Sequence, residues 1–340
     1  MIDRPKPAPL PAGAMPARRR LMLASIALLS PAASRAQPAA RLRLIGILGA
    51  ARPAEGNDPM LTFIAELAKL GWVEEKTITV VRRNAELRYD SFPERARELV
   101  GLGVELLVVN AGVTGALAAK QATATIPILA IGVADPVKFG LVTSLARPGG
   151  NVTGFAATTT DWGKYLELAR EAVAGANRIA IIANPTNVSY PDYVAANESA
   201  ARQLGLRLQM IPVSRTAELA PAFEAMKRER ADVLIFGPDP IFLSGMGDIL
   251  ERARDNGLPV VAPFRQAAER GALISLGLDI RDMLRVAASY ADRILRGTKP
   301  ADLPILQPTR FELIVNQRAA TSLGIRIPQS LRLRADEVIE

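Results

Sequence analysis

Two stretches of this 340-residue chain carry the same succession of strand, helix and glycine at a fixed separation. Four positions recur 134 residues later without a gap, and the pairs are Ile45 and Ile179, Asp58 and Asp192, Leu70 and Leu204, and Gly71 and Gly205. In each copy an apolar stretch precedes an acidic residue that can begin a helix, and a glycine ends that helix. The duplication predicts two similar lobes. A coincidental match is the alternative, because this spacing is common in α/β proteins.

Short apolar stretches alternate with helical periodicity along the whole chain, which is typical of parallel sheets in α/β proteins. We expect strands at residues 42–49, 77–81, 106–110, 128–132, 152–155, 178–183, 206–211, 233–236, 260–262, 272–278 and 311–316. We expect helices at residues 58–70, from 90 onward, and at 114–122, 137–145, 162–173, 192–204, 217–227, 241–256, 283–295 and 319–323. The pattern predicts an α/β fold with parallel, doubly wound sheets.

The first 36 residues have the composition of a secretory signal peptide. Three arginines ending at Arg20 precede the apolar stretch 21–29, and the small residues Ser34 and Ala36 predict cleavage after Ala36. An uncleaved interfacial anchor is the alternative. The arginines fit both general and twin-arginine export.

Composition argues against several classes of function. Removing the leader lowers the formal net charge from +8 to +3, and the remaining charges alternate in sign along helices, so we expect no nucleic-acid partner. The sequence has no histidine and no cysteine, which removes the usual general base, the thiol nucleophile and the commonest metal ligands. It also lacks the glycine loops, hydrolase elbow and calcium loop that mark common enzyme and metal sites. We therefore expect no enzyme, no cofactor and no metal site.

The most specific motif of the chain lies in residues 128–154, where an apolar strand is followed by turns and a second strand. The motif consists of Asp135-Pro136-Val137, Gly140-Leu141-Val142, Ser144-Leu145 and Arg147-Pro148-Gly149-Gly150-Asn151-Val152-Thr153-Gly154. These residues resemble a family of bacterial ABC-transporter substrate-binding proteins that includes binders of tryptophan and other aromatic amino acids. The resemblance runs from about Leu44 to the C-terminus.

This resemblance implies the type I periplasmic binding protein fold, with two Rossmann-like lobes whose parallel, doubly wound sheets are joined by a three-strand hinge. It places residues 41–157 and 279–304 in the N-terminal lobe, and residues 158–278 and 305–340 in the C-terminal lobe. It further implies a monomer in the periplasm that closes about a ligand and presents it to an ABC permease in the inner membrane.

The loops after the strands are the candidate ligand-binding segments, because ligands of open α/β sheets bind at the carboxyl ends of strands. These loops are residues 50–57, 110–114, 133–136, 184–192, 237–242 and 263–266. The candidate ligand-binding residues are Ala50, Asn110, Gly112, Val113, Thr114, Asp135, Asn184, Ser189, Tyr190 and Asp239.

The chemistry of a zwitterion suggests roles for some of these residues. The helix start at residues 110–114 can hold a carboxylate, with Thr114 as a hydroxyl donor. Asp239, or Asp135 in the other lobe, can pair with an ammonium group, and Tyr190 can stack on a ligand. Ordinary N-capping, Asx-Pro turns and a surface tyrosine are the respective alternatives.

Trp72 and Trp162 lie near helix ends, and we interpret both as structural packing. The sequence thus predicts an exported receptor of an ABC importer for a small polar ligand, with an amino acid as the leading ligand by family analogy. One alternative is a periplasmic receptor that is not coupled to transport. A regulator of the lactose-repressor type is disfavoured by the leader, and an α/β enzyme by the absence of histidine and cysteine.

Overall fold

The structure is a computed structural model that describes residues 1–2, 8, 42–51, 58–157, 162–307 and 311–340. The chain divides into two units, residues 1–41 and residues 42–340, and the following concerns the second unit. The predicted signal peptide and its cleavage site after Ala36 lie outside the described residues, apart from Met1, Ile2 and Ala8.

The first sheet has five parallel strands in the order β2-β1-β3-β4-β5. The strands are β1 (Arg43–Gly49), β2 (Ile78–Asn84), β3 (Leu106–Asn110), β4 (Ile128–Ala134) and β5 (Val152–Ala157). Their residues are mostly buried, as expected for a parallel sheet that is covered on both faces.

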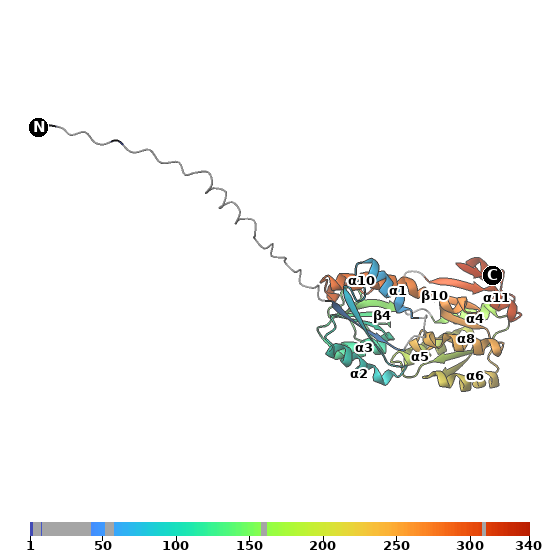
Figure 1. The fold of residues 1–340 in the computed structure, drawn as a ribbon. Coiled ribbons are helices and arrows are strands. Elements are labelled where there is room, and N and C mark those ends of the chain that lie inside the picture. Colours follow the sequence, from blue (N-terminus) through green and yellow to red (C-terminus); the bar gives the residue numbers. More distant parts are fainter. Residues whose placement is uncertain (3–7, 9–41, 52–57, 158–161, 308–310) are drawn as a thin grey trace. The chain divides into compact units, whose positions relative to one another are not determined.

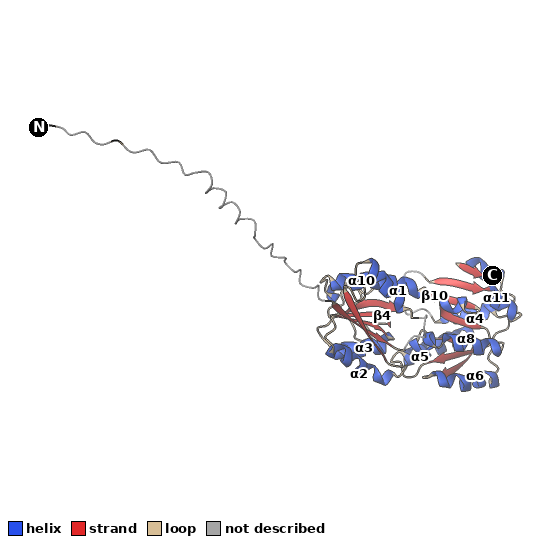
Figure 2. Cartoon of the chain, in the orientation of Figure 1, coloured by secondary structure: helices blue, strands red, loops and turns tan. Residues whose placement is uncertain are grey.

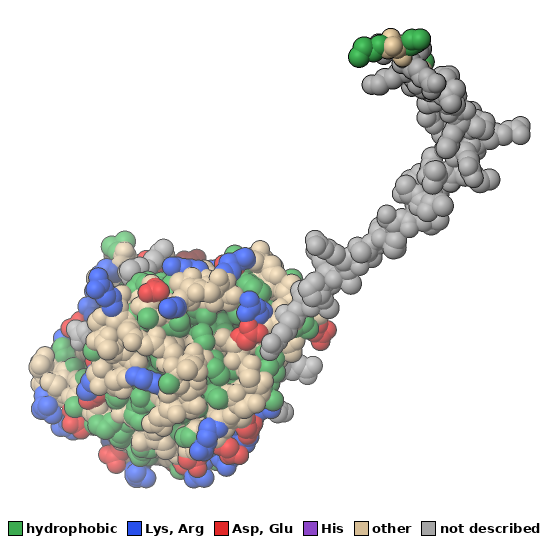
Figure 3. All heavy atoms as spheres, turned by 90° about the vertical axis from the view of Figure 1, so that its left-hand side faces the viewer, with side chains coloured by type: hydrophobic (Ala, Val, Ile, Leu, Met, Phe, Trp, Pro, Cys, Tyr) green, Lys and Arg blue, Asp and Glu red, His purple; other side chains and the backbone are tan. Residues whose placement is uncertain are grey.

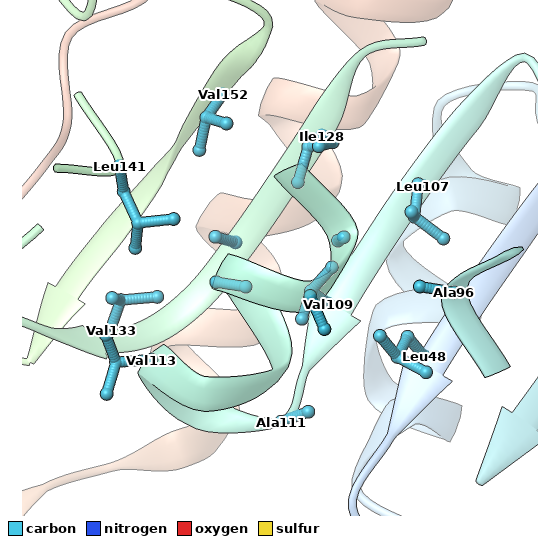
Figure 4. Close-up of a cluster of buried hydrophobic side chains, with 14 of the residues drawn as sticks. Leu48, Ala96, Leu107, Val109, Ala111, Val113, Ile128, Val133, Leu141 and Val152 are labelled. Carbon is cyan, nitrogen blue, oxygen red and sulfur yellow. The ribbon is translucent and has the colours of Figure 1, made fainter. Parts of the chain in front are cut away.

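Helices cover both faces of this sheet (Figure 1). One face carries α1 (Met60–Lys69) and α10 (Ile280–Leu295), and the other carries α2 (Phe92–Gly101) and α3 (Gly112–Ala122). Two short 3-10 helices, η2 (Tyr89–Ser91) and η4 (Pro300–Asp302), lie in the same part. Figure 4 shows the apolar side chains that pack between the strands and α2 and α3. We call this five-stranded part the first lobe.

The second sheet has seven strands in the order β12-β11-β10-β9-β8-β6-β7, and only β11 runs antiparallel to its neighbour β10. The strands are β6 (Arg178–Ala183), β7 (Arg207–Pro212), β8 (Val233–Phe236), β9 (Val260–Phe264), β10 (Ile274–Leu278), β11 (Glu312–Asn316) and β12 (Glu337–Ile339). We call this part the second lobe, and Figure 2 shows the strands of both lobes in red.

Helices also cover both faces of the second sheet. One face carries α4 (Gly163–Ala172), α5 (Tyr190–Leu204), α11 (Gln317–Ser322) and α12 (Gln329–Arg334). The other carries α6 (Leu219–Arg228), α7 (Pro240–Ser244), α8 (Met246–Asp255) and α9 (Arg265–Glu269), with η3 (Thr216–Glu218) before α6. The fold class predicted from the sequence, two doubly wound α/β lobes, is confirmed.

The predicted duplication appears in the strand order, because β2-β1-β3-β4-β5 of the first lobe matches β7-β6-β8-β9-β10 of the second. The fifth strand of each copy carries a glycine that the neighbouring backbone requires. A Cβ atom at Gly154 would lie 1.9 Å from the Ala130 carbonyl oxygen, and one at Gly277 would lie 1.8 Å from that of Pro263. Both glycines adjoin a register shift between the fourth and fifth strands, so the two lobes share a local distortion as well as a topology.

The chain passes from the first lobe at Ala157 to the second lobe at Trp162, returns near Asp279, and is in the second lobe again at β11; residues 158–161 and 308–310 lie outside the described residues. The lobe boundaries stay a prediction, and the backbone hydrogen bonds show only where the chain runs after Pro304. The Ile305 N–H donates to the Leu145 carbonyl, and the Leu306 N–H donates to that of Gly154. Ile305 and Leu306 therefore extend the first sheet beside β5 rather than beginning the second lobe.

Two predicted helices differ from the structure. Residues 137–145 form consecutive turns instead of a helix, because Gly140 has a φ of 68° and the Thr143 hydroxyl bonds the carbonyls of Arg147 and Pro148. The predicted helix 241–256 is divided at Gly245 into α7 and α8. The short elements α9, α12 and β12 were not predicted, since each has only three to six residues.

Candidate functional site

A cavity of about 980 Å³ lies between the carboxyl ends of the two sheets and is lined by both lobes. Nine of the ten predicted ligand-binding residues line it, namely Ala50, Asn110, Gly112, Val113, Asp135, Asn184, Ser189, Tyr190 and Asp239. The tenth, Thr114, lies at a contact between the lobes, where its hydroxyl oxygen accepts the Val188 N–H at 3.4 Å. A role of these residues in binding a ligand stays a prediction.

The carboxylate of Asp239 is the buried polar centre of the cavity wall. It caps α7, because Oδ1 accepts the Ile241 N–H at 3.0 Å. The same oxygen accepts the Tyr89 hydroxyl at 2.6 Å and Asn184 Nδ2 at 3.2 Å, while Oδ2 accepts Asn187 Nδ2 at 2.7 Å. Helix capping, the alternative role of Asp239, is therefore present, and it coexists with exposure of this residue to the cavity.

Asp239 has neutral hydrogen-bond donors and no cationic partner in the described part of the chain. Only 5% of the residue is exposed. Burial raises the pKa of Asp239 above its usual value, and the four hydrogen bonds lower it only in part. Burial and the nearby charge of Asp239 also raise the pKa of the Tyr89 hydroxyl, which keeps it a donor. A buried carboxylate in this setting is stabilised by an added cation.

The N-terminus of α3 lies on the first-lobe side of the cavity. Asn110 ends β3, and the N-cap residue Ala111 has no side chain that could accept the first helical N–H groups. No other side chain among the described residues caps this helix, so the N-capping alternative is wrong here. The uncapped N–H groups and the helix dipole favour an anion. Val113 contributes backbone rather than side chain, since its isopropyl group packs in the core beside Val133 (Figure 4).

Asp135 and Asn187 hold the loops that line the cavity. Asp135 has a φ of 30°, and its Oδ1 accepts the Lys138 N–H at 3.0 Å, which is the predicted alternative of turn formation. Asn187 Oδ1 accepts both the N–H and the hydroxyl of Ser189. The amide of Asn187 thereby connects Ser189, at the start of α5, to Asp239.

Aromatic side chains that sequence reasoning did not select form a wall on the second-lobe side. Trp162 stacks on Tyr165, with ring centroids 5.5 Å apart, and meets the edge of Tyr193 at 4.8 Å. All three line the cavity. Trp162 therefore has the structural packing that the sequence predicted, and it also forms part of the cavity wall. Because Tyr193 lies one turn after Tyr190 on α5, the helical spacing was a signal that could have found it.

Three polar side chains of the cavity have buried atoms without a hydrogen-bond partner in the described part of the chain. They are Arg82 at Nε, from β2 in the first lobe, and Tyr193 at its hydroxyl and Gln266 at Oε1, from α5 and α9 in the second. Arg82 also forms two loose ion pairs, from Nε to Asp58 at 4.0 Å and from Nη1 to Glu74 at 3.7 Å. Donor and acceptor atoms of the cavity wall thus lack hydrogen bonds within the described residues.

Surface charges outside the cavity are mixed in sign, and Figure 3 shows basic and acidic side chains interspersed on one face. Within the described residues, no group of three or more acidic side chains is placed to hold a metal ion. None of the described helices combines the length and apolar character needed to cross a bilayer.

Comparisons with known proteins place the chain in context. The family model described as ABC transporter substrate binding protein matches residues 61–339. A tyrosine-binding protein of Clostridioides difficile is 28% identical over 81% of this chain and 78% of its own length.

Solved structures share the fold. A conserved domain protein from Vibrio cholerae has a TM-score of 0.79 and 26% identity, covering 88% of this chain and all of the other. An ABC domain from Streptococcus pneumoniae in complex with L-Trp has a TM-score of 0.76 and 23% identity, with the same coverage. A lac repressor shares the fold alone, with a TM-score of 0.53 and 16% identity over 88% of this chain and 84% of the other.

Proposed function

We propose that this chain, which belongs to the family of ABC transporter substrate-binding proteins, binds an L-amino acid with an aromatic side chain in the cavity between its lobes. The family consists of binding proteins rather than enzymes. The proposal for this chain rests on the charges and rings that line the cavity.

The buried carboxylate of Asp239 is the observation that carries the proposal. A carboxylate that is 5% exposed and lacks a cation recovers part of its lost hydration when an ammonium group binds beside it. Oδ2 accepts one hydrogen bond, from Asn187, and so retains acceptor capacity for the ligand. We infer that the α-ammonium group of the ligand binds there.

The first lobe offers the opposite electrostatics for the α-carboxylate. The N-terminus of α3 at Gly112 and Val113 presents uncapped N–H groups. On the same lobe, Arg82 Nε has no hydrogen-bond partner among the described residues and only a 4.0 Å ion pair with Asp58. A zwitterion would thus contact one lobe with each charged group, and its binding would favour closure of the lobes.

The aromatic wall of Trp162, Tyr165 and Tyr193 supports a ligand with a ring. Aromatic pairs contribute about 0.5–1.5 kcal/mol beyond the burial of their area, so such a wall discriminates between aromatic and aliphatic amino acids. The two relatives named for tyrosine and tryptophan are consistent with this ligand class.

We propose that the protein is exported by a signal peptide cleaved after Ala36 and acts as a monomer in the periplasm. In that compartment it would present its ligand to an ABC permease in the inner membrane. A hinge between the lobes, as the family resemblance implies, would allow closure. The family membership supports the transport partner, and the composition of residues 1–36 supports export.

A calorimetric titration of residues 37–340 with L-tyrosine, L-tryptophan, L-leucine, L-glutamate and 3-(4-hydroxyphenyl)propionate tests the ligand class. We expect L-tyrosine or L-tryptophan to bind most tightly, and the propionate, which lacks the amino group, to bind at least about a hundredfold more weakly. Saturation at 100 times Kd would stabilise the protein by about 2.7 kcal/mol, which thermal unfolding detects.

A Trp162→Ala variant is the matched control for the ring. Its affinity for L-tryptophan should fall by about tenfold, while any residual binding of L-leucine should change little. Equal affinity of the wild type for the amino acid and for the propionate would refute the role of Asp239.

A further inference from the structure

Residues 85–89 form a segment of the first lobe that reaches the second lobe, and we call it the β2–η2 segment. Glu86 and Leu87 have φ values of 51° and 61°, a left-handed conformation that is costly for residues other than glycine. Hydrogen bonds to the first lobe hold it, because the Ala85 N–H donates to the Gly49 carbonyl at 3.0 Å and the Leu87 N–H donates to that of Ala50 at 2.8 Å. The segment is therefore a fixed part of the first lobe.

The β2–η2 segment packs against the second lobe through two side chains. Leu87 contacts the buried apolar clusters of both lobes. The ring of Tyr89 lies 5.1 Å from that of Phe92 in the first lobe, and its hydroxyl donates to Asp239 Oδ1 of the second lobe at 2.6 Å. An apolar contact and a hydrogen bond thus cross between the lobes side by side.

Tyr89 does not line the cavity among the described residues, whereas Asp239 does. Tyr89 is 6% exposed and its hydroxyl donates to Asp239 Oδ1, so it can act on the ligand only through Asp239. A hydrogen bond to an ionised acceptor is stronger than one to a neutral acceptor. Any group that keeps Asp239 ionised therefore also strengthens its bond to Tyr89.

We propose that Tyr89 is a positioning residue that couples recognition of the ligand's ammonium group to closure of the lobes, by donating its hydroxyl hydrogen across the cleft to Asp239. This inference rests on the proposed function. Tyr89 contacts Oδ1 of the carboxylate and the ligand would contact Oδ2, so each stabilises the arrangement that the other requires. By thermodynamic reciprocity, the ligand's ammonium group favours closure to the same extent that closure favours binding of that group.

The proposal has a consequence for specificity. A ligand without an ammonium group would leave Asp239 without a cation, and the bond from Tyr89 would then hold the lobes less firmly. Such a ligand would bind in the cavity without producing the closed form in full. Full closure would therefore require a ligand that both fills the cavity and carries an ammonium group.

The test compares Tyr89→Phe with Tyr290→Phe. Tyr290 is also buried, but its hydroxyl donates to the Pro304 carbonyl at 2.9 Å within the first lobe. We expect Tyr89→Phe to weaken binding of the amino acid by about ten- to a hundredfold, mainly through faster dissociation. Tyr290→Phe should leave the affinity within about threefold of the wild type, because its bond does not cross the cleft.

Closure is measured separately by energy transfer between dyes on Arg97→Cys in α2 and Lys227→Cys in α6. Both side chains are exposed, and the chain has no other cysteine, so labelling is specific. At saturating ligand, Tyr89→Phe should show a smaller closed fraction than the wild type and than Tyr290→Phe. Unchanged affinity and unchanged closed fraction in Tyr89→Phe would overturn the proposal.

The two proposals fail in different ways. If Asp239→Asn loses the amino acid while Tyr89→Phe binds it and closes like the wild type, the proposed function holds and the coupling is wrong. If the wild type binds no amino acid, the proposed function is wrong. In that case the closed fractions of ligand-free wild type and ligand-free Tyr89→Phe are compared. Equal fractions would show that the Tyr89–Asp239 bond does not hold the lobes together.

Discussion

Two of the polar contacts between the lobes lie in opposite surroundings. The Tyr89–Asp239 hydrogen bond lies between residues that are 6% and 5% exposed, and it connects a neutral donor to an uncompensated carboxylate. The Lys138–Asp192 ion pair lies at the exposed rim of the cavity, with 53% and 51% of the two side chains exposed. Both side chains of the exposed contact are charged, whereas only Asp239 is charged in the buried contact. The groups of the buried contact have lost more of their hydration.

The difference teaches that charge alone does not decide which contact holds the lobes. An exposed ion pair contributes about 0.2–1 kcal/mol, because water screens it and its long side chains lose entropy. A hydrogen bond to a buried ion contributes about 1.5–3 kcal/mol, and an unmade one leaves a desolvated group without a partner. We therefore expect closure to depend on Tyr89 and Asp239, with Lys138 and Asp192 adding little.

Replacing the buried acceptor should have the largest effect. Asp239→Ala leaves four donors without their acceptor and removes the proposed site for the ammonium group. We expect at least about a hundredfold loss of affinity for the amino acid, measured by calorimetry. Asp192→Ala, at the exposed rim of the cavity, is the matched control and should stay within about threefold. Similar losses in both variants would contradict the comparison.

Lowering the pH should weaken binding through the buried carboxylate. Burial raises the pKa of Asp239 above 3.8 in the folded protein, so the carboxylate takes up a proton at a higher pH than it would when exposed. Affinity for the amino acid should therefore fall, by up to about tenfold per pH unit, as the pH drops through this raised pKa. Titrations from pH 7 to pH 4 measure the slope, and the residual affinity of Asp239→Asn, measured at higher ligand concentration, should lack it.

The same raised pKa makes a prediction of opposite sign for the ligand-free protein. A group whose pKa is raised by folding contributes stability below its unfolded pKa, and this contribution is lost as the pH rises through the folded pKa. The melting temperature of Asp239→Asn relative to the wild type should thus increase from pH 4 to pH 7. A relative melting temperature that decreases over this range would show that the hydrogen bonds outweigh the desolvation.

Removing the exposed ion pair should have a small effect that depends on salt. Lys138→Ala is expected to weaken binding by no more than about threefold at low ionic strength, and by less at 0.5 M salt, where the Debye length is about 4 Å. Tyr89→Phe should show nearly the same loss at both salt concentrations. If the loss of affinity in Tyr89→Phe disappeared at high salt, the Tyr89–Asp239 contact would be screened by solvent like the exposed ion pair, which would contradict the comparison.

The smallest effect is expected at Thr114, whose hydroxyl oxygen lies 3.4 Å from the Val188 nitrogen. A contact of this length is weak, and Val188 is exposed, so water can replace the lost acceptor. Thr114→Val should change the affinity by less than about twofold in the same titrations. A larger loss would assign Thr114 a direct contact with the ligand, as first predicted from its place in the sequence.

Part of the site could be predicted from the sequence because strand ends are local features. The ends of β3, β6 and β8 follow from apolar stretches and the small or polar residues behind them, and these loops do line the cavity. The same local reasoning failed at residues 137–145, where apolar spacing predicted a helix. There the turns closed by Asp135 and Thr143 compete with helical hydrogen bonds.

The sequence by itself determined the two-lobe α/β fold, because the alternation of strands and helices and its recurrence after 134 positions are encoded in local periodicity. Only the tertiary structure decided that Tyr89 meets Asp239, 150 positions away, and that Trp162 and Tyr193 share one wall. The reason is that periodicity fixes which face of an element is buried, whereas the side chains that meet across a cleft depend on how two lobes dock.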